Sequence, residues 1–234
     1  MSVPARNHSG SRPRAAPKAR EAYHHGDLRN AAVAEAVRLI GQTRDTDFTL
    51  RDLAARLRVS STALYRHFPS KLALLAAVAE EGFRELVEAC ARHEMLLQTD
   101  PVAGLREQGL EYVRFALRNP GHFRVMFSPE LARAKEQFPS LREAGQASYR
   151  QLKGTLTACQ ARGLLNDFDL DAIALTAWST VHGIATLLLD GLVKLDESGS
   201  ASEEQILGVA RQVIRIMRYG ALRPVPGAKE AGKG

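Results

Sequence analysis

The stretch FTLRDLAARLRVSSTALYRHFPSK, residues 48–71, decides the fold of the N-terminal part of this 234-residue chain. Thr49 has a side chain that caps helices, and Asp52 places a negative charge in the first turn that would follow. Leucine and alanine then recur at helical spacing, which predicts a short helix with one apolar face. Ser60 offers a second cap directly before residues 61–67. The stretch therefore predicts two short helices joined by a tight turn.

The second of these helices divides its side chains between two directions. Leu64 and Phe68 lie four residues apart and face the core, whereas short, aromatic and basic side chains between them are left for solvent or a partner. Pro69 ends the helix, and Ser70 caps a third helix with Lys71 in its first turn, where free backbone N–H groups bind anions. This pattern is typical of a helix-turn-helix that places one helix in a groove of DNA. The alternative is an ordinary helical hairpin with a polar surface.

Residues 23–86, and the segment LYRHFPSK at 64–71 above all, resemble the N-terminal domain of the TetR family of bacterial transcriptional regulators. The resemblance implies that nine residues contact DNA, in three groups. Tyr65, His67 and Lys71 would contact phosphates. Ser60, Ser61, Thr62 and Ala63 would face the bases or the groove wall. Thr49 and Arg51, at the start of the earlier helix, would touch the DNA backbone.

One position in the turn departs from the family pattern. Arg58 stands where the family usually has glycine. A residue other than glycine is unfavourable at positive φ, so we expect this turn to be strained or slightly different. Alternatively, Arg58 adds a phosphate contact.

Charge is distributed unevenly along the chain. Residues 1–72 carry thirteen Lys and Arg against six Asp and Glu, whereas residues 73–234 carry nineteen against twenty. The whole net charge of +6 therefore lies in the part that contains the motif, as binding to a polyanion requires. A solubilising basic tail is the alternative interpretation.

Cysteine use and the N-terminus favour a cytoplasmic protein. Cys90 and Cys159 are far apart and form no CxxC pattern, which argues against a disulfide framework. No apolar stretch follows the basic N-terminus, so we expect no signal peptide. The most apolar run, residues 173–189, is short for a membrane span and is better interpreted as a buried helix.

The remaining pattern predicts an all-α protein of about nine helices, with no convincing strand and no internal repeat. We expect a disordered basic arm (residues 1–22), a three-helix DNA-binding domain (23–86), a helical bundle for dimerisation and ligand sensing (87–222) and a flexible tail (223–234). One long helix from Ser70 to about Leu97 should join the two domains. The arm is either a plain tail or a further contact with DNA.

A second motif lies in the C-terminal half. Trp178 and His182 are four residues apart on one helix face, with Gly183 beside them. This motif and the segment GHFRVMF at 121–127 resemble a TetR C-terminal subclass named for its Trp-His-Gly pattern. The resemblance implies a dimeric, ligand-sensing domain. Core packing with a satisfied imidazole is the equal alternative.

We expect a small, mainly hydrophobic effector to bind among large side chains of three segments. The candidates are Tyr112, Phe115, Phe123, Met126, Phe127, Trp178 and His182.

The helix expected at residues 170–193 is apolar nearly all round, so it must be covered on all sides. One side meets its own domain, and we expect the other to meet a second copy of the chain. The candidate interface residues are Leu188, Val209, Val213, Ile216 and Met217.

Together these features predict a ligand-responsive transcriptional regulator that binds a palindromic operator as a homodimer. They favour a repressor over an activator. The alternative is an architectural DNA-binding dimer without an effector. An enzyme is disfavoured, because the sequence has no nucleophile–base pair, phosphate-cradling loop or set of metal ligands. We predict no cofactor, no bound metal and no membrane partner.

Overall fold

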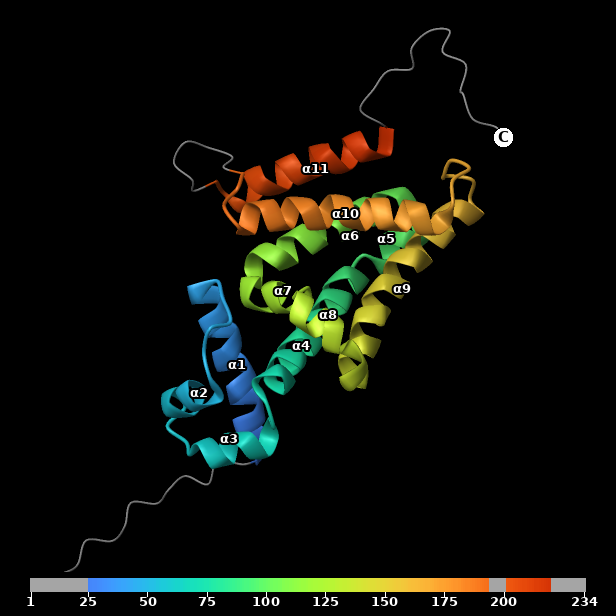
Figure 1. Cartoon of the computed structure of the whole chain (residues 1–234). Coiled ribbons are helices and arrows are strands. Elements are labelled where there is room, and N and C mark those ends of the chain that lie inside the picture. Colours follow the sequence, from blue (N-terminus) through green and yellow to red (C-terminus); the bar gives the residue numbers. More distant parts are fainter. Residues whose placement is uncertain (1–24, 194–200, 220–234) are drawn as a thin grey trace, which may run out of the picture.

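A computed structural model describes residues 25–193 and 201–219, and within these ranges all regular secondary structure is helical (Figure 1). The all-α prediction is confirmed, but the expected number of about nine helices is too low. The arm expected at residues 1–22 and the tail expected at 223–234 lie outside the described residues. Eleven α-helices and one 3-10 turn, η1, follow in chain order: α1 (His25–Thr43), α2 (Leu50–Arg56), α3 (Ser61–His67), α4 (Lys71–Ala91), α5 (Glu94–Thr99), α6 (Pro101–Arg118), α7 (Pro120–Met126), α8 (Pro129–Ala134), η1 (Lys135–Gln137), α9 (Pro139–Ala161), α10 (Leu170–Leu189) and α11 (Glu203–Tyr219).

The first three helices pack around a small core at one end of the molecule (Figure 1). Ala32, Ala36 and Ala54 are buried there, and such small side chains let helices approach closely. Leu53 and Leu64 fill the remaining space and have no exposed surface. This packing fixes α2 and α3 as a pair and leaves the opposite face of α3 outside.

Helix α4 joins this end to the rest of the molecule, and α7 packs against both α4 and α1. Two glycines permit the close approach. A Cβ on Gly121 would lie 2.3 Å from the carbonyl oxygen of Val37 in α1, and one on Gly82 would lie 2.6 Å from Met126 Sδ. Any larger residue at Gly121 would therefore push α7 away from α1.

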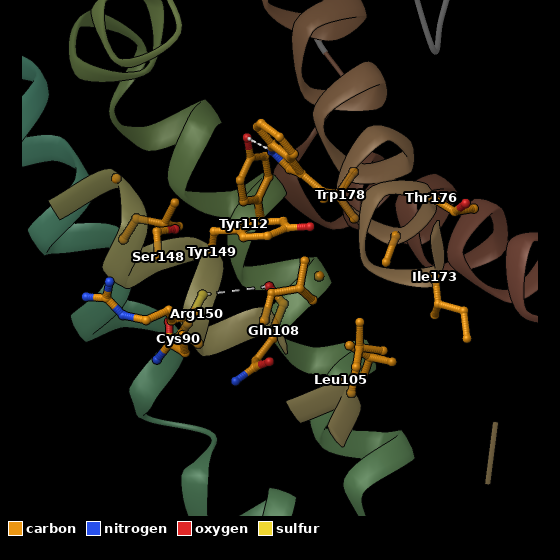
Figure 2. Close-up of a pocket in the computed structure, with 18 of the residues that line it drawn as sticks. Cys90, Leu105, Gln108, Tyr112, Ser148, Tyr149, Arg150, Ile173, Thr176 and Trp178 are labelled. Atoms are coloured by element: carbon orange, nitrogen blue, oxygen red, sulfur yellow. Dashed lines mark hydrogen bonds between the residues drawn. The ribbon is translucent and has the colours of Figure 1, made fainter. Parts of the chain in front are cut away.

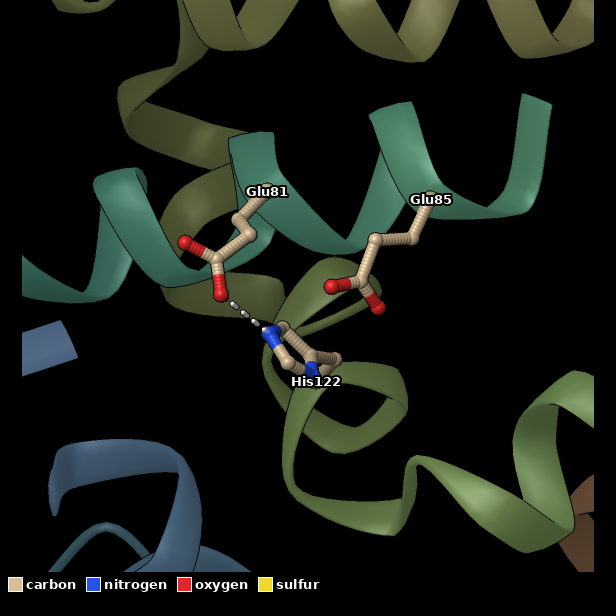
Figure 3. Close-up of side chains that lie close together, drawn as sticks. All are labelled: Glu81, Glu85 and His122. Carbon is tan, nitrogen blue, oxygen red and sulfur yellow. Dashed lines mark hydrogen bonds and ion pairs between the residues drawn. The ribbon is translucent and has the colours of Figure 1, made fainter. Parts of the chain in front are cut away.

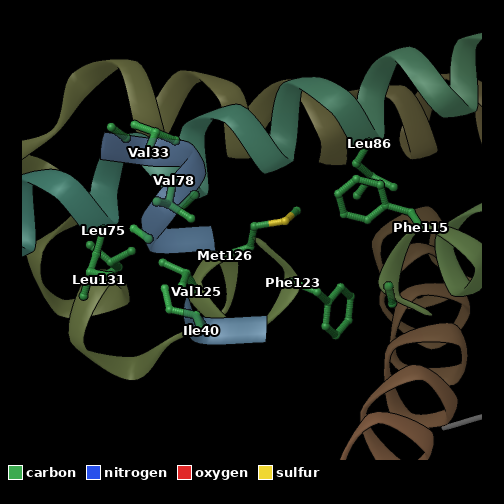
Figure 4. Close-up of a cluster of buried hydrophobic side chains, with 14 of the residues drawn as sticks. Val33, Ile40, Leu75, Val78, Leu86, Phe115, Phe123, Val125, Met126 and Leu131 are labelled. Atoms are coloured by element: carbon green, nitrogen blue, oxygen red, sulfur yellow. The ribbon is translucent and has the colours of Figure 1, made fainter. Parts of the chain in front are cut away.

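Buried side chains continue without a break from the first helices into the C-terminal bundle. Figure 4 shows Val33 of α1, Val78 of α4 and Val125 of α7 in one cluster, with Phe115 of α6 further along. The structure therefore has one continuous core, and the expected domain boundary near residue 86 stays a prediction.

The chain does not form the single helix expected from Ser70 to Leu97. Helix α4 ends at Ala91, His93 N–H donates to the Cys90 carbonyl at 3.2 Å, and α5 starts at Glu94. The bend folds Leu97 back onto α6, where its side chain occupies the space beside Gly104. This contact between Leu97 and α6 is not visible in the continuous helical pattern of the sequence.

Helix α10 is the most apolar helix of the bundle, but only one of its faces is covered. Its buried residues are Ala174, Ala177, Val181 and Ala185, and only 17% of its most apolar stretch is buried. The other face is uncovered in the single chain, and its expected contact with a second copy stays a prediction. Within the described ranges, α10 is also the one helix long and apolar enough to cross a membrane, a property that core helices share.

Candidate DNA interface and ligand cavity

The start of α2 is held by local hydrogen bonds, as the sequence predicts. Thr49 and Asp52 form a capping box, in which Asp52 N–H donates to Thr49 Oγ1 at 3.1 Å and Thr49 N–H donates to Asp52 Oδ2 at 2.8 Å. The Thr49 hydroxyl donates to the same carboxylate at 2.7 Å. These hydrogen bonds lower the pKa of Asp52 and engage the only hydroxyl proton of Thr49.

Arg58 adopts the left-handed conformation at the end of α2, with a φ of 56°. Its N–H donates to the Ala55 carbonyl at 3.1 Å, and Val59 N–H donates to the Ala54 carbonyl at 3.0 Å. This pair of bonds is the Schellman arrangement that glycine usually terminates. The turn thus keeps the expected geometry with an arginine in the strained position.

Helix α3 presents a polar outer face because its apolar residues are turned inward. Ser60 Oγ accepts from Ala63 N–H at 3.1 Å, which confirms it as the N-cap. Leu64 and Phe68 are buried, whereas Thr62, Tyr65 and Arg66 are exposed. The exposed fraction of Tyr65 is 44%, a large value for an aromatic side chain in a folded domain.

Basic side chains lie beside the turn that connects α3 to α4. Ser70 Oγ accepts from Ala73 N–H at 3.1 Å and so caps α4. Lys71 Nζ lies 5.2 Å from the centre of the Phe48 ring, and the Arg29 guanidinium lies 5.6 Å from that of Phe68. The rings position two cations beside α3, and Arg29 was not among the predicted contacts.

The nine predicted DNA contacts fall on one end of the molecule, on α2 and α3 with their N-caps and on the first turn of α4. Five are exposed and four are half-buried. The exposed ones are Thr49, Arg51, Ser60, Thr62 and Tyr65, and the half-buried ones are Ser61, Ala63, His67 and Lys71. Their assignment to bases or phosphates stays a prediction.

A large cavity lies in the C-terminal bundle (Figure 2), with a volume of about 1810 Å³. Helices α4, α6, α9, α10 and α11 supply most of its wall. Most of the wall is apolar, as expected of a site for an organic molecule. Of the predicted effector residues, Tyr112, Met126, Phe127 and Trp178 line it.

Phe115, Phe123 and His182 are not part of this wall, although they were predicted to be. Phe123 and His182 belong to an aromatic cluster behind it, with ring centres 5.4 Å apart. Phe115 is a core residue with 3% exposure. The sequence analysis missed Tyr149, whose ring centre lies 6.1 Å from that of Trp178. Its isolated position in α9 carries no motif that would have signalled this role.

Trp178 and His182 are connected through a third residue (Figure 2 shows the first bond). Trp178 Nε1–H donates to the Tyr112 hydroxyl oxygen at 3.3 Å, and this hydroxyl lies 2.9 Å from His182 Nδ1. The Tyr112 hydroxyl is therefore within hydrogen-bonding distance of both side chains. Burial raises the pKa of Tyr112 and lowers the pKa of His182, which keeps both groups neutral. One nitrogen of the imidazole, Nδ1, therefore has a hydrogen-bond partner, and the choice between core packing and ligand lining stays open.

Three possible metal ligands meet outside this cavity (Figure 3). Glu81 and Glu85 lie one turn apart on α4, and His122 of α7 faces them, with potential ligand atoms within 4.8 Å of one another. His122 Nε2 lies 3.1 Å from Glu81 Oε1. This contact ties α7 to α4, and a structural role accounts for it without an ion.

Apolar side chains remain exposed along α10 and α11. The exposed fractions are 55% for Leu175, 43% for Leu187 and 51% for Ile216. Of the predicted interface residues, Val209 and Ile216 are exposed and Leu188 and Val213 are half-buried. Met217 instead packs partly against the core of its own chain and lines the cavity. Leu175 and Leu187 were not predicted, because an all-apolar helix does not reveal which face its own domain covers.

Two family models match the chain in separate parts. The model described as bacterial regulatory proteins, tetR family, matches residues 32–78, and the model described as tetracyclin repressor-like, C-terminal domain, matches residues 105–210. Among curated proteins, the nucleoid occlusion factor SlmA of Serratia proteamaculans (strain 568) is 32% identical over 136 residues, which cover 56% of this chain and 67% of SlmA.

Solved structures share the fold. A protein of unknown function from Rhodococcus sp. RHA1 has a TM-score of 0.64 and 31% identity, and the match covers 83% of this chain and 97% of that one. The regulator PfmR from Thermus thermophilus has a TM-score of 0.60 and 22% identity over 82% of this chain and 99% of its own.

Proposed function

Because this chain belongs to the TetR family of bacterial regulatory proteins, and so is a DNA-binding transcription regulator, we propose that it is a repressor that a small apolar effector releases from its operator. The observation that carries the proposal is the apolar cavity beside Trp178, in the same chain as a helix-turn-helix. The similarity of residues 121–127 and 178–183 to the Trp-His-Gly subclass supports it. A regulator of this kind acts on the chromosome, so the proposed location is the cytoplasm.

Helix α3 is the proposed recognition helix. The exposure of Thr62 and Tyr65 supports contacts from its outer face, and short side chains at its N-terminal end suit close approach to base edges. Lys71, in the first turn of α4, is the proposed phosphate anchor. The Thr49 hydroxyl donates its proton to the Asp52 carboxylate. We therefore propose that Thr49 lies against the DNA backbone without donating a hydrogen bond to it.

The proposed signal runs from the cavity to the DNA through α4 and α7. Helix α4 carries Lys71 at one end and cavity residues Leu86 and Cys90 at the other. Helix α7 adds Met126 and Phe127 to the cavity wall, while its first turn packs against α1. A ligand that prefers one setting of these helices tenfold supplies about 1.4 kcal/mol per site for the shift.

The proposed assembly is a two-fold dimer through α10 and α11. The uncovered apolar face of these helices supports it, since such a face is stabilised by contact with an identical face. Two symmetric α3 helices would then read a palindromic operator.

A screen of small apolar compounds tests the effector proposal. Trp178 is the only tryptophan, so its fluorescence reports binding, and the anisotropy of a labelled operator in the same sample reports release. Ser148 lines the cavity, and Ser148→Phe should abolish both responses while leaving operator affinity unchanged. Ser140→Phe, the same change on an exposed part of α9, should retain both.

A second function, a DNA-bound factor that senses no ligand, is favoured by one observation. Trp178 Nε1 and His182 Nδ1 already have a partner in the Tyr112 hydroxyl, so neither atom needs one from a ligand. The relative SlmA is a nucleoid occlusion factor by name, which fits such a role. Operator binding without any fluorescence response across the screen would support this second function.

A further inference from the structure

One polar group in the wall of the cavity lacks a hydrogen-bond partner. Gln108 of α6 is buried, with 7% of its surface exposed, and it lines the cavity (Figure 2). Its Oε1 accepts from Thr155 Oγ1 at 2.9 Å, whereas its Nε2 has no partner among the described residues. A buried N–H group without an acceptor lowers stability, so its presence in a cavity wall points to an acceptor that the ligand supplies.

The orientation of this amide is fixed from α9. Thr155 Oγ1 lies 2.9 Å from Gln108 Oε1 and 3.2 Å from the Gln151 carbonyl, so the nearer acceptor receives the hydroxyl proton. Gln151 is itself held to α4 by a bond from its Nε2 to the Val87 carbonyl at 3.1 Å. Because Thr155 occupies the oxygen end of Gln108, the NH₂ end of this cavity-lining side chain is the one without a partner.

The charges around the cavity indicate the sign of the ligand. Seven basic side chains from α6, η1, α9 and α11 line it, against two acidic ones, Glu136 and Asp169. Glu136 is paired with Arg142 at 2.5 Å, so this ion pair adds no net charge, and the other six basic side chains outnumber Asp169. The wall therefore attracts anions and repels cations.

We infer that the effector is an apolar molecule ending in a carboxylate, and that Gln108 Nε2 donates a hydrogen bond to that carboxylate. This inference rests on the proposed effector cavity and adds the chemical class of its ligand. The carboxylate satisfies the vacant N–H group, the apolar part covers the aromatic wall beside Tyr112 and Trp178, and the basic side chains provide the favourable field. Gln108 is thus the residue that determines which head group is accepted.

Titration of the full-length protein with decanoate and with decylamine, followed by Trp178 fluorescence, tests the inference without DNA. The wild type should bind decanoate more tightly than decylamine. Gln108→Leu should weaken decanoate binding by about tenfold or more, because a hydrogen bond to a charged group is lost. Gln108→Glu should reverse the preference, since its carboxylate repels decanoate and accepts from the ammonium group. Gln160→Leu, the same change at an exposed position of α9 outside the cavity wall, should leave decanoate affinity unchanged.

Folding of the variants is checked independently. Gln108→Leu removes a buried unpaired group, so its urea midpoint should equal or exceed that of the wild type. Equal decanoate affinity in the wild type and Gln108→Leu, or tighter binding of decylamine than of decanoate by the wild type, would overturn the inference and leave the cavity proposal standing. If neither probe changes Trp178 fluorescence, both the inference and the proposed effector cavity fail.

Discussion

Arg58, like Arg44, is a residue of the DNA-binding end with a strained backbone, and its φ is 56° in the turn before α3. Glycine adopts this conformation without steric cost, so Arg58→Gly should raise the free energy of unfolding by about 1 kcal/mol. Arg56→Gly, two residues earlier in the last turn of α2, should lower it by about the same amount. Urea unfolding followed by circular dichroism measures both. Equal destabilisation by the two changes would contradict this account of the turn.

His182 makes stability depend on pH. Burial lowers its pKa from the ordinary value of 6.5, so below about that pH the unfolded chain binds a proton that the folded chain does not. The free energy of unfolding is therefore complete above this value and falls as the pH decreases towards the lowered pKa. We expect the loss between about pH 7.5 and about pH 5.5 in urea titrations to be smaller for His182→Asn than for the wild type. An identical pH dependence would show that the bond to Tyr112 does not need the neutral imidazole.

For single residues, the sequence predicted the side-chain hydrogen bonds whose two partners are close together in the chain. The caps at Thr49, Ser60 and Ser70 involve atoms three positions away, and all are present. Gln108 was not predicted, because its partner Thr155 lies 47 positions away on α9. Only the packing of α6 against α9 shows that one end of this amide is satisfied and the other is not.

Helix α3 should determine which bases are preferred, whereas the first turn of α4 should contribute affinity for any DNA sequence. Lys71→Ala removes a phosphate contact, so it should weaken binding to every sequence and shallow the salt dependence by about one unit of slope per protomer. Substitutions at Thr62 should instead change which bases are preferred. Fluorescence anisotropy over a series of salt concentrations separates the two effects. A Lys71→Ala protein with altered base preference and an unchanged salt slope would show that the roles are misassigned.

The ends of helices were predicted well where a helix breaker or a capping residue marks them. They were predicted poorly where tertiary packing determines where a helix ends. Pro69 with Ser70 separates α3 from α4 as expected, and Asp169 and Ser202 begin the last two helices. The break between α4 and α5 has no proline or glycine, and it brings Leu97 into contact with α6 beside Gly104. No local pattern carries that information.

The proposed dimer interface is a property of the whole molecule, because the uncovered apolar face extends over both α10 and α11. Ile216→Glu places a charge in the proposed interface and should give a monomer with weak operator binding, by analytical ultracentrifugation and anisotropy. Met95→Glu is the control, since Met95 is 74% exposed on α5, away from α10 and α11. It should remain dimeric and bind normally. A monomeric wild type that binds its operator normally would exclude the dimer.

Selection of bound duplexes from a random library, followed by sequencing, tests the central claim most directly. A dimer with one α3 helix per protomer should enrich a palindrome with half-site centres roughly 34–36 Å apart, about one DNA turn, or slightly more. Addition of an apolar carboxylate during the selection should abolish the enrichment. Retention of DNA without any common motif, or enrichment of a single asymmetric half-site, would contradict the account of this protein as a dimeric, operator-specific regulator.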